Sequence, residues 1–457
     1  MYRDGIGRLP AFIKVPGTRL LAAVLTVVFA AYILWKIGQS PDQALQFAFN
    51  GLAVGAVYAL LAMGFTIVYS TVWFFDLYYG AAAALGAYGV FYLSSQDTLQ
   101  GRYEVDNLYI SIVFGAVTGG VVAWALREGL SPRLRRRLNF RSLRVVEGLL
   151  AASTGIYTGF LLAYPDILNL MLSPVIGVVI AIVVGWLLYE VFWRLMGRAG
   201  VRPFTLAAPG GAVLGVYCGT LVASTTDFNL YLSWGVSCLM AGAVGLALYR
   251  GLYMYMRQRA RSPLIMLVAS LGVLLAITAL TTIVFQPTPK PLPEAFASEP
   301  WIVGKAHLKG FNIFAIGVAL LGFVGLLALL KKTAFGKAVR AIGDDEEVSK
   351  VVGINTTTVI AVVFFIGAVF AALAGILSGH DTAIQPRMGL LLLLKGWIAS
   401  VIGGIGNLYG ALVGGFALGL IEQFGIWDLA GEWKDPISFI LLILFLAFWP
   451  KGLLARR

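Results

Sequence analysis

Long runs of uncharged or nearly uncharged residues alternate with short polar segments over the whole chain. Most of these runs are close to the ~20 residues that an α-helix needs to cross the hydrocarbon core of a bilayer. The fourteen runs are 20–35, 44–70, 72–95, 107–126, 148–164, 167–189, 204–226, 229–249, 263–286, 311–330, 356–379, 389–403, 408–426 and 436–449. The pattern predicts an all-α polytopic membrane protein with about 12–14 transmembrane helices, some of them broken or re-entrant.

The composition excludes a soluble globular domain. Hydrophobic residues make up 59% of the chain, charged residues 12%, and the mean hydropathy is +0.86. Basic residues precede the first run, as they do in a secretory signal peptide. However, no small-residue cleavage site follows it, because the sequence continues Tyr32-Ile33-Leu34-Trp35-Lys36. We therefore interpret this run as a retained first span.

Clusters of Lys and Arg predict the orientation, since such residues in short loops stay on the cytoplasmic side of a membrane. The clusters are 1–19, 127–144, 194–202, 250–261, 331–350 and 451–457. Counting through fourteen spans from a cytoplasmic N-terminus places all six clusters, and both termini, on the cytoplasmic side. The net charge of +12 is then a signature of topology. The basic run 133–137 is an orientation signal or a contact with anionic membrane lipid, and we expect no nucleic-acid partner.

The polar segment 331–355 has more internal structure than a simple connection between two spans needs. Asp344 and Glu347 have the spacing of a capping box, and Gly353 is a C-terminal stop signal. Glu346 and Lys350 are spaced for an i,i+4 ion pair. These signals predict a short amphipathic helix at about 344–352.

Two apolar faces are expected in this segment. Val348, Val351 and Val352 would form one face of the short helix. Ahead of it, the spacing of Phe335, Val339 and Ile342 predicts a second helical segment, with Lys337 and Arg340 on its other faces. The pair could bind a partner, or it could be an interfacial helix lying on the lipid headgroups.

Glycine is abundant, with 54 residues, and it is densest at 401–415. The run before this patch, 389–403, is short for a full crossing. Broken or re-entrant helices are tolerated where they face protein or a watery cavity, so Gly403, Gly404 and Gly406 are candidates for the translocation pathway. Close packing of helix backbones is the alternative explanation.

Cysteine and histidine are too sparse to indicate chemistry. Cys218 and Cys238 lie within apolar runs, and His307 and His380 lie in predicted outward loops far apart in the sequence. The chain has no Walker A pattern, no HExxH and no serine nucleophile elbow. We expect no metal, no cofactor and no enzymatic activity, so the energy for any transport must come from a partner or a gradient.

Several motifs resemble those of the Liv-type branched-chain amino-acid ABC permeases. The C-terminal motifs are Gly336–Ala341, Val352–Asn355, Gly367–Ala368, Ala374–Gly375, Val401–Gly406, Gly410–Ala411 and Trp449–Leu453. The motifs near the N-terminus are Phe49–Leu52, Gly55–Leu60 and Gly64–Tyr69. Both blocks follow the family's order and spacing. The match covers about 45–95 and 232–457.

The resemblance implies a permease subunit of an ATP-binding-cassette importer in the cytoplasmic membrane. Its expected partners are ABC ATPase subunits, a second permease subunit and an extracytoplasmic solute-binding protein. The solutes would be small and neutral or zwitterionic, with branched-chain or related amino acids expected first. Segment 331–355 is similar to the family's ATPase-contacting loop, which assigns coupling to the following residues: Phe335, Gly336, Arg340, Asp344, Glu347, Val348, Val351, Val352 and Gly353.

The resemblance also divides the chain. Residues 1–43 would hold the N-terminal basic segment and first span, and 44–106 the first permease block. Nothing matches between them and the second block at 232–457, so 107–231 is predicted to be an inserted bundle of extra spans. We expect this bundle to pack outside the transport pathway.

Charged residues inside the spans are functional candidates, because each costs at least a few kcal/mol near the bilayer centre. Lys395 and Glu422 occupy places that are often Lys and Glu in the resembling family. They are predicted to form a buried pair with a structural role. Asp76 follows an aromatic run and could mark a broken helix beside the pathway, or it could be an interfacial cap.

One motif departs from the family. Where relatives usually carry an Asn-Phe-Ala-His-Gly-like segment, this chain has Asp76-Leu77-Tyr78-Tyr79-Gly80. Tyr79 and Gly80 therefore join Asp76 as candidate pathway residues at which substrate or gating differs. The main alternative is an ion-coupled secondary transporter of small solutes, which would use Asp76 together with Glu422.

Overall fold

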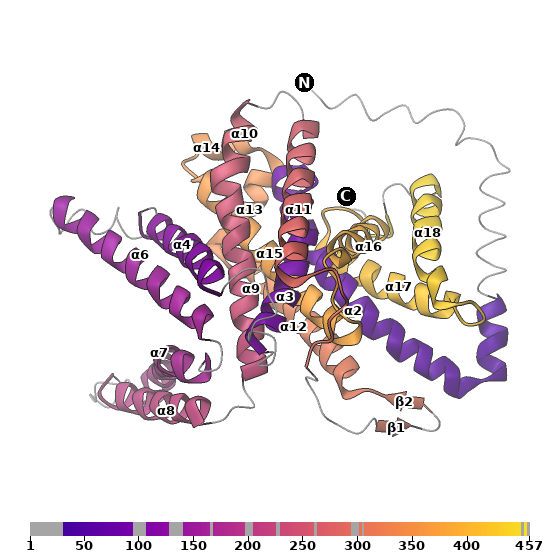
Figure 1. The fold of residues 1–457 in the computed structure, drawn as a ribbon, viewed down its shortest axis with the longest axis horizontal. Coiled ribbons are helices and arrows are strands. Elements are labelled where there is room, and N and C mark those ends of the chain that lie inside the picture. The colour runs from indigo at the N-terminus through magenta and orange to yellow at the C-terminus, as the bar shows by residue number, and fades with distance from the viewer. Residues whose placement is uncertain are drawn as a thin grey trace.

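The computed structural model describes residues 31–94, 107–127, 140–164, 168–196, 204–224, 229–259, 263–293, 301–303, 306–448 and 452–454. The predicted N-terminal basic segment and most of the predicted first span lie outside these residues, as do both chain termini. Most of the described residues are helical (Figure 1). The helices are α2 (Pro41–Val72), α3 (Tyr78–Ser94), α4 (Asn107–Ala125), α6 (Phe140–Ala163), α7 (Leu168–Met196), α8 (Phe204–Ser224), α9 (Asn229–Leu248), α10 (Met254–Arg259), α11 (Pro263–Phe285), α12 (Gly310–Lys332), α13 (Ala334–Asp344), α14 (Glu346–Val351), α15 (Thr356–Asp381), α16 (Met388–Gly403), α17 (Leu408–Gly425) and α18 (Lys434–Phe448).

The all-α polytopic prediction is confirmed. Within the described residues, seven helices are long and apolar enough to cross a membrane, and four shorter helices are also apolar. The predicted short run before the glycine patch is α16, with 16 residues. A small antiparallel hairpin, β1 (Trp301–Val303) and β2 (Ala306–Leu308), is added in the segment between α11 and α12.

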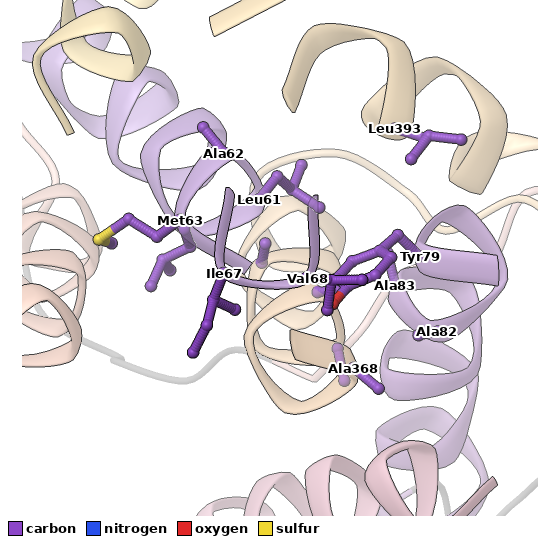
Figure 2. Packing of buried hydrophobic residues seen from close by; sticks show 14 of the residues in the cluster. Leu61, Ala62, Met63, Ile67, Val68, Tyr79, Ala82, Ala83, Ala368 and Leu393 are labelled. Carbon is purple, nitrogen blue, oxygen red and sulfur yellow. The ribbon is translucent and has the colours of Figure 1, made fainter. Parts of the chain in front are cut away.

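Helix α2 is the centre of the bundle. It has 32 residues, begins with Pro41 at a first-turn position, and packs against α17, α15, α16 and α12. It ends at Trp73, which adopts a left-handed conformation with φ of 57° and donates its N–H to the carbonyl of Tyr69, 3.0 Å away. Figure 2 shows Leu61, Met63 and Ile67 of α2 in the apolar core, with side chains of α3 and α15 nearby.

Glycine seams bring backbones together at the contacts of α2. A Cβ added to Gly55 would lie 2.8 Å from the Cα of Phe416, and one added to Gly419 would lie 2.4 Å from the carbonyl oxygen of Gly51. The α3–α15 contact is as close, because a Cβ on Gly375 would lie 2.0 Å from the carbonyl oxygen of Ala83. In a bilayer, such close approach supplies the van der Waals contact that holds helices together.

Helices α4, α6, α7 and α8 stand to one side of this core (Figure 1). They pair as α4 with α6 and α7 with α8, each pair closing on glycines such as Gly155 and Gly215. The core touches them through α9 and through a hydrogen bond from the Tyr92 hydroxyl to the carbonyl of Leu162, 3.0 Å long. These four helices make up the described part of the predicted insertion at 107–231, and its placement outside the pathway stays a prediction.

The two ends of the bundle are distinct. Helices α10, α13 and α14 lie at one end, and the β1–β2 hairpin lies at the other (Figure 1). At the hairpin end, Lys290 and Ile384 exchange backbone hydrogen bonds of 3.0 and 2.8 Å, which join the α11–α12 segment to the α15–α16 turn. Also outside the spans, Asp428 accepts from Tyr32 and from Lys36 at 3.0 Å, and the Lys36 bond lowers the pKa of its carboxyl.

Candidate transport and coupling sites

Helix α13 is anchored in the bundle by one face. Thr333 caps its N-terminus by accepting from the N–H of Gly336 at 3.1 Å. Val339 and Ile342 are buried, and Phe335 is half-buried beside them, as the predicted apolar spacing requires. Arg340 donates to the carbonyl of Gly336, 3.3 Å away. The helix therefore presents its apolar side to the spans and its basic side elsewhere.

The fit at both ends of α13 depends on glycine. A Cβ on Gly336 would lie 2.1 Å from the carbonyl oxygen of Leu330, and one on Gly343 would lie 2.3 Å from that of Ser70. The indole N–H of Trp73 donates to the carbonyl of Gly343 at 3.0 Å. The end of α2 and the end of α13 are thus held against each other.

The predicted capping box of the next helix is wrong by one residue. Asp345, and not Asp344, is the N-cap of α14, because its carboxylate accepts from the N–H of Val348 at 3.0 Å. Asp344 is instead the last residue of α13. The two predicted segments are therefore separate helices with a sharp corner at Asp345. The expected Glu346–Lys350 ion pair is present, at 2.9 Å.

The valine face of α14 has no cover in the described part of the chain. Val348, Val351 and Val352 are 57%, 88% and 75% exposed. Gly353 ends the helix with φ of 92°, and its N–H donates to the carbonyl of Lys350 at 3.0 Å. Such a conformation favours glycine, because a Cβ would be strained there. A group of exposed valines on a rigid, capped helix is suited to contact with a partner.

A third short helix supports α14 from the side. The chain of α9 continues through a π-helical turn, Tyr249–Tyr253, into α10. From α10, Arg257 forms an ion pair and hydrogen bond with Glu346 of α14. In the same stretch the guanidinium of Arg250 lies 5.2 Å from the ring of Trp124, at the end of α4. Basic residues from the predicted clusters at 250–261 and 331–350 therefore meet at one end of the bundle.

Asp76 lies in the α2–α3 corner and is buried. Its Oδ1 accepts from the hydroxyl of Tyr253 at 2.9 Å and from the N–H of Tyr78 at 3.0 Å. Its Oδ2 is buried with no hydrogen-bond partner among the described residues. Asp76 thus lies at the start of α3 and is tied to the π-helical turn that leads to α10, and its role beside the pathway stays a prediction.

Tyr79 and Gly80 lie in tight helix contacts. A Cβ on Gly367 would lie 1.5 Å from the Tyr79 hydroxyl, so the phenol occupies the space that this glycine leaves (Figure 2 shows Tyr79 beside Ala368). A Cβ on Gly80 would lie 2.6 Å from the carbonyl oxygen of Gly389 on α16. Tyr79 thus packs α3 against α15, and Gly80 packs it against α16. The role of both residues in transport stays a prediction.

The glycine patch forms the turn between α16 and α17. Gly404 and Gly406 have φ of 108° and 85°, and the backbones of Gly403 and Gly410 touch, since a Cβ on Gly403 would lie 1.8 Å from the Gly410 carbonyl oxygen. Leu453 donates its N–H to the carbonyl of Ile402 at 2.8 Å. These contacts are those of a tightly packed helical hairpin, and a pathway role for the glycines stays a prediction.

The structure brings Lys395 and Glu422 together. The Lys395 Nζ lies 3.4 Å from Oε1 of Glu422, whose side chain is fully buried. Tyr58 donates to Oε2 of Glu422 at 2.7 Å, and Ser438 donates to its Oε1. Lys395 also reaches the Oδ1 of Asp435 at 2.8 Å and the hydroxyl of Tyr58 at 3.1 Å. The pair is therefore part of a five-residue polar network.

Sequence reasoning missed three members of this network. Tyr58, Asp435 and Ser438 lie on α2 and α18, and no spacing relates them to the pair. The only available signal was that Asp435 and Lys434 are charged residues at the start of an apolar run.

Asp76 does not belong to this network. It lies just beyond the end of α2, and about 21 Å of this helix separates Tyr58 from Val72 at 1.5 Å per residue. Asp76 and Glu422 thus do not share one ion site.

A cavity of about 230 Å³ adjoins the network. Its walls are contributed by α2, α12, α15, α16 and α18. The lining residues are Ala53, Val54, Val57, Tyr58, Phe311, Asn312, Ala315, Leu377, Ser378, Asp381, Thr382, Met388, Leu391, Leu392, Lys395, Lys434 and Asp435. Most of the wall is apolar, and two lysines and two aspartates are grouped on it.

No group of three or more His, Cys, Asp or Glu side chains within the described residues could hold a metal. Cys238 is buried and Cys218 is partly exposed. His380 was expected in a loop but belongs to the last turn of α15, where its ring lies 5.0 Å from that of Trp234. It is a packed aromatic side chain.

A bundle of apolar helices with amphipathic helices at one end and a charged cavity at the other defines a membrane transport subunit. The comparison with known families agrees, because a family described as "Branched-chain amino acid transport system / permease component" matches residues 47–136 and 195–446. The chain belongs to this family. The unmatched stretch 137–194 falls within the predicted insertion.

Individual relatives are similar over a third to a half of this chain. The high-affinity branched-chain amino acid transport permease LivH of Salmonella typhimurium is 36% identical over 225 residues, 48% of this chain and 72% of that protein. BraD of Pseudomonas aeruginosa, with the same description, is 31% identical over 49% of this chain and 74% of its own length. The fructose import permease FrcC of Rhizobium meliloti is 35% identical over 34% of this chain and 46% of its own length. No solved structure matches.

Proposed function

We propose that this permease component is one membrane subunit of an ATP-driven importer for apolar amino acids. Its ATPase partner would dock on α14, and a second permease subunit and an external solute-binding protein would complete the complex. Family membership supports the transport role. The names of the LivH and BraD relatives support an amino-acid substrate, while FrcC shows that a related permease is named for a sugar.

The observation that carries the proposal is the contrast between α13 and α14. Val339 and Ile342 of α13 are buried in the bundle, whereas Val351 of α14 is 88% exposed. A helix pair that is fixed on one side and apolar on its free side can transmit a push from a partner to the spans. An interfacial helix would also bury valines in lipid, so the two explanations require an experiment.

The end that carries α10, α13 and α14 is proposed to be cytoplasmic. Its basic residues support this orientation, because Lys and Arg mark the cytoplasmic side. The cavity beside Lys395 then lies toward the outside, since α2 spans about 28 Å between Ala53 at the cavity and Val72 at the coupling end. Both termini would be cytoplasmic, as the charge count predicts.

The test compares Val351→Glu with Val351→Ile in liposomes that contain the permease and the ATPase subunits that co-purify with it. Val351→Glu should leave the spans folded, because the side chain makes little contact with them, but it should weaken ATPase retention and ATP-dependent leucine uptake at least tenfold. Val351→Ile keeps the apolar surface and should behave as wild type. Unchanged retention and uptake in Val351→Glu would refute docking on this face.

The substrate class is tested with the same liposomes. ATP-dependent uptake of leucine, isoleucine or valine with little uptake of fructose would support the amino-acid assignment. The reverse preference would assign the chain to sugar import while leaving the permease role intact.

A further inference from the structure

The cavity beside Lys395 is placed where a solute would arrive from outside the membrane. It is lined by the first turn of α12, the last turn of α15 and the first turn of α18. At its other end, α12 continues into α13, and the other end of α15 directly follows α14. The cavity and the proposed docking face are therefore at opposite ends of the same helices.

Its charges are unevenly matched. Lys395 is shared between Glu422, which is fully buried, and Asp435, which is 43% exposed. The Glu422 carboxylate is already bonded to Tyr58 and Ser438, so it is held in place without a solute. Asp435 has no such support in the network and lies at the cavity wall. A solute carboxylate could replace Asp435 on Lys395 without breaking the buried part of the network.

The displaced Asp435 would then be available for a cation. A solute that brings both a carboxylate and an ammonium group can satisfy Lys395 and Asp435 together. A simple acid would take Lys395 and leave Asp435 without its cation, while a simple amine would have to compete with Lys395 for Asp435, so neither satisfies both groups. The arrangement therefore selects zwitterions over simple acids and amines.

Most of the remaining wall is apolar, although Asn312, Asp381 and Lys434 also line it. Val54, Val57, Leu391 and Leu392 are among its residues. At about 30 Å³ per water, the cavity has room for roughly eight water-sized groups, which is close to the size of leucine. An apolar side chain would displace water from these walls, whereas a sugar would have to give up hydrogen bonds there.

We propose that this cavity is the outward-facing binding site of the permease for an apolar amino acid. The solute carboxylate takes the place of Asp435 on Lys395, its ammonium group pairs with Asp435, and its side chain lies against α2 and α16. This inference rests on the proposed function, because it names the substrate class and the residues of the same transport process. Solute binding also removes the Lys395–Asp435 link between α16 and α18, so it can loosen α18 from the cavity rim.

The first experiment measures binding of radiolabelled L-leucine to the full-length permease in lipid nanodiscs, without ATP. The competitors are 4-methylpentanoate, which lacks the amine, and 3-methylbutylamine, which lacks the carboxylate. Both should compete at least tenfold less well than unlabelled leucine. Equal competition by either single-charge analogue, or no leucine binding at all, would overturn the site.

The second experiment uses matched variants. Leu391→Trp should fill the cavity and reduce leucine binding at least tenfold, whereas Leu390→Trp is the control, since Leu390 is similarly exposed on the same helix but does not line the cavity. Asp435→Asn should reduce binding of leucine and not of 4-methylpentanoate, with the exposed Glu432→Gln as its control. Equal leucine binding in Leu391→Trp and Leu390→Trp would overturn the proposal. Because Asp435 is partly exposed, its variant tests the site even if Leu391→Trp fails to fold.

Uptake assays separate this inference from the proposed function. If ATP-dependent leucine uptake persists with normal concentration dependence in Leu391→Trp and Asp435→Asn, this cavity is not the site, although the permease is still an amino-acid importer. If wild-type liposomes show no ATP-dependent leucine uptake, the proposed function itself fails. Loss of uptake in both variants, with ATPase retention unchanged, supports the site.

Discussion

The network around Glu422 makes an asymmetric prediction about stability. Lys395→Met removes the cation that pairs with the fully buried Glu422 carboxylate. Breaking a buried pair in this way typically costs 3–5 kcal/mol, so we expect about 3 kcal/mol, because the Tyr58 and Ser438 hydroxyls still donate to Glu422. Glu422→Gln should cost less, about 1 to 2 kcal/mol, because Lys395 keeps Asp435 at 2.8 Å and is 13% exposed.

The double variant Lys395→Met/Glu422→Gln leaves no unpaired buried charge. We expect its loss to be about 2 kcal/mol, well below the sum of the single losses, which gives a coupling energy of about 2 to 3 kcal/mol. Asp435→Asn is the control, since a partly exposed ion pair contributes about 1 kcal/mol or less. The unfolding free energies are measured by SDS titration of the purified permease in mixed micelles.

Two results would refute this reasoning. Strictly additive losses would mean that Lys395 and Glu422 are not energetically coupled. Equal losses for Lys395→Met and Glu422→Gln would mean that Asp435 does not hold the lysine once Glu422 is neutral, which would contradict the shared-cation geometry on which the cavity proposal depends.

Three further predictions concern the rest of the bundle. Gly367→Ala should destabilise the protein by about 2 kcal/mol, because its methyl group would overlap the Tyr79 hydroxyl, and Tyr79→Phe in the same chain should recover part of the loss in the SDS titration. Gly353→Ala should cost about 1 kcal/mol through its φ of 92° while leaving ATPase retention measurable, and a gain in stability would contradict the left-handed helix end. Arg257→Gln should lower ATP-dependent leucine uptake severalfold with little change in stability, because it frees Glu346 of α14 from α10, and unchanged uptake would show that this link does not contribute to coupling.

The helical architecture was predictable because burial in lipid imposes it. An apolar run of about 20 residues has no alternative to a helix in a bilayer, since its backbone groups must bond within the segment. The amphipathic spacing of Val339 and Ile342 likewise anticipated which face of α13 is buried. The N-cap of α14 was missed because Asp344 and Asp345 can both cap a helix. Which of them does so depends on where α13 ends, and this end is set by contacts with Ser70 and Trp73.

The polar network was only half predictable for a related reason. Lys395 and Glu422 stand out as charges in apolar runs. Tyr58 lies more than 300 positions away from them, and a tyrosine in an apolar run does not stand out in the sequence. Its contact is created by the packing of α2 against α16 and α17. Asp435 was inconspicuous because a charge at the start of a span is usually solvated. The cavity is formed by the packing of these helices, and no local sequence pattern indicates it.

The glycine seam between α2 and α17 has a consequence for how such a permease can change over evolutionary time. Backbones that already touch leave no side chain to exchange, so a substitution at Gly55 or Gly419 cannot be compensated by a neighbour. The cavity wall at Leu391 has no such restriction, because this leucine is 47% exposed and its side chain can be exchanged. Substitutions in the cavity wall could therefore change which solute is bound, while the glycine contacts between α2 and α17 stay the same.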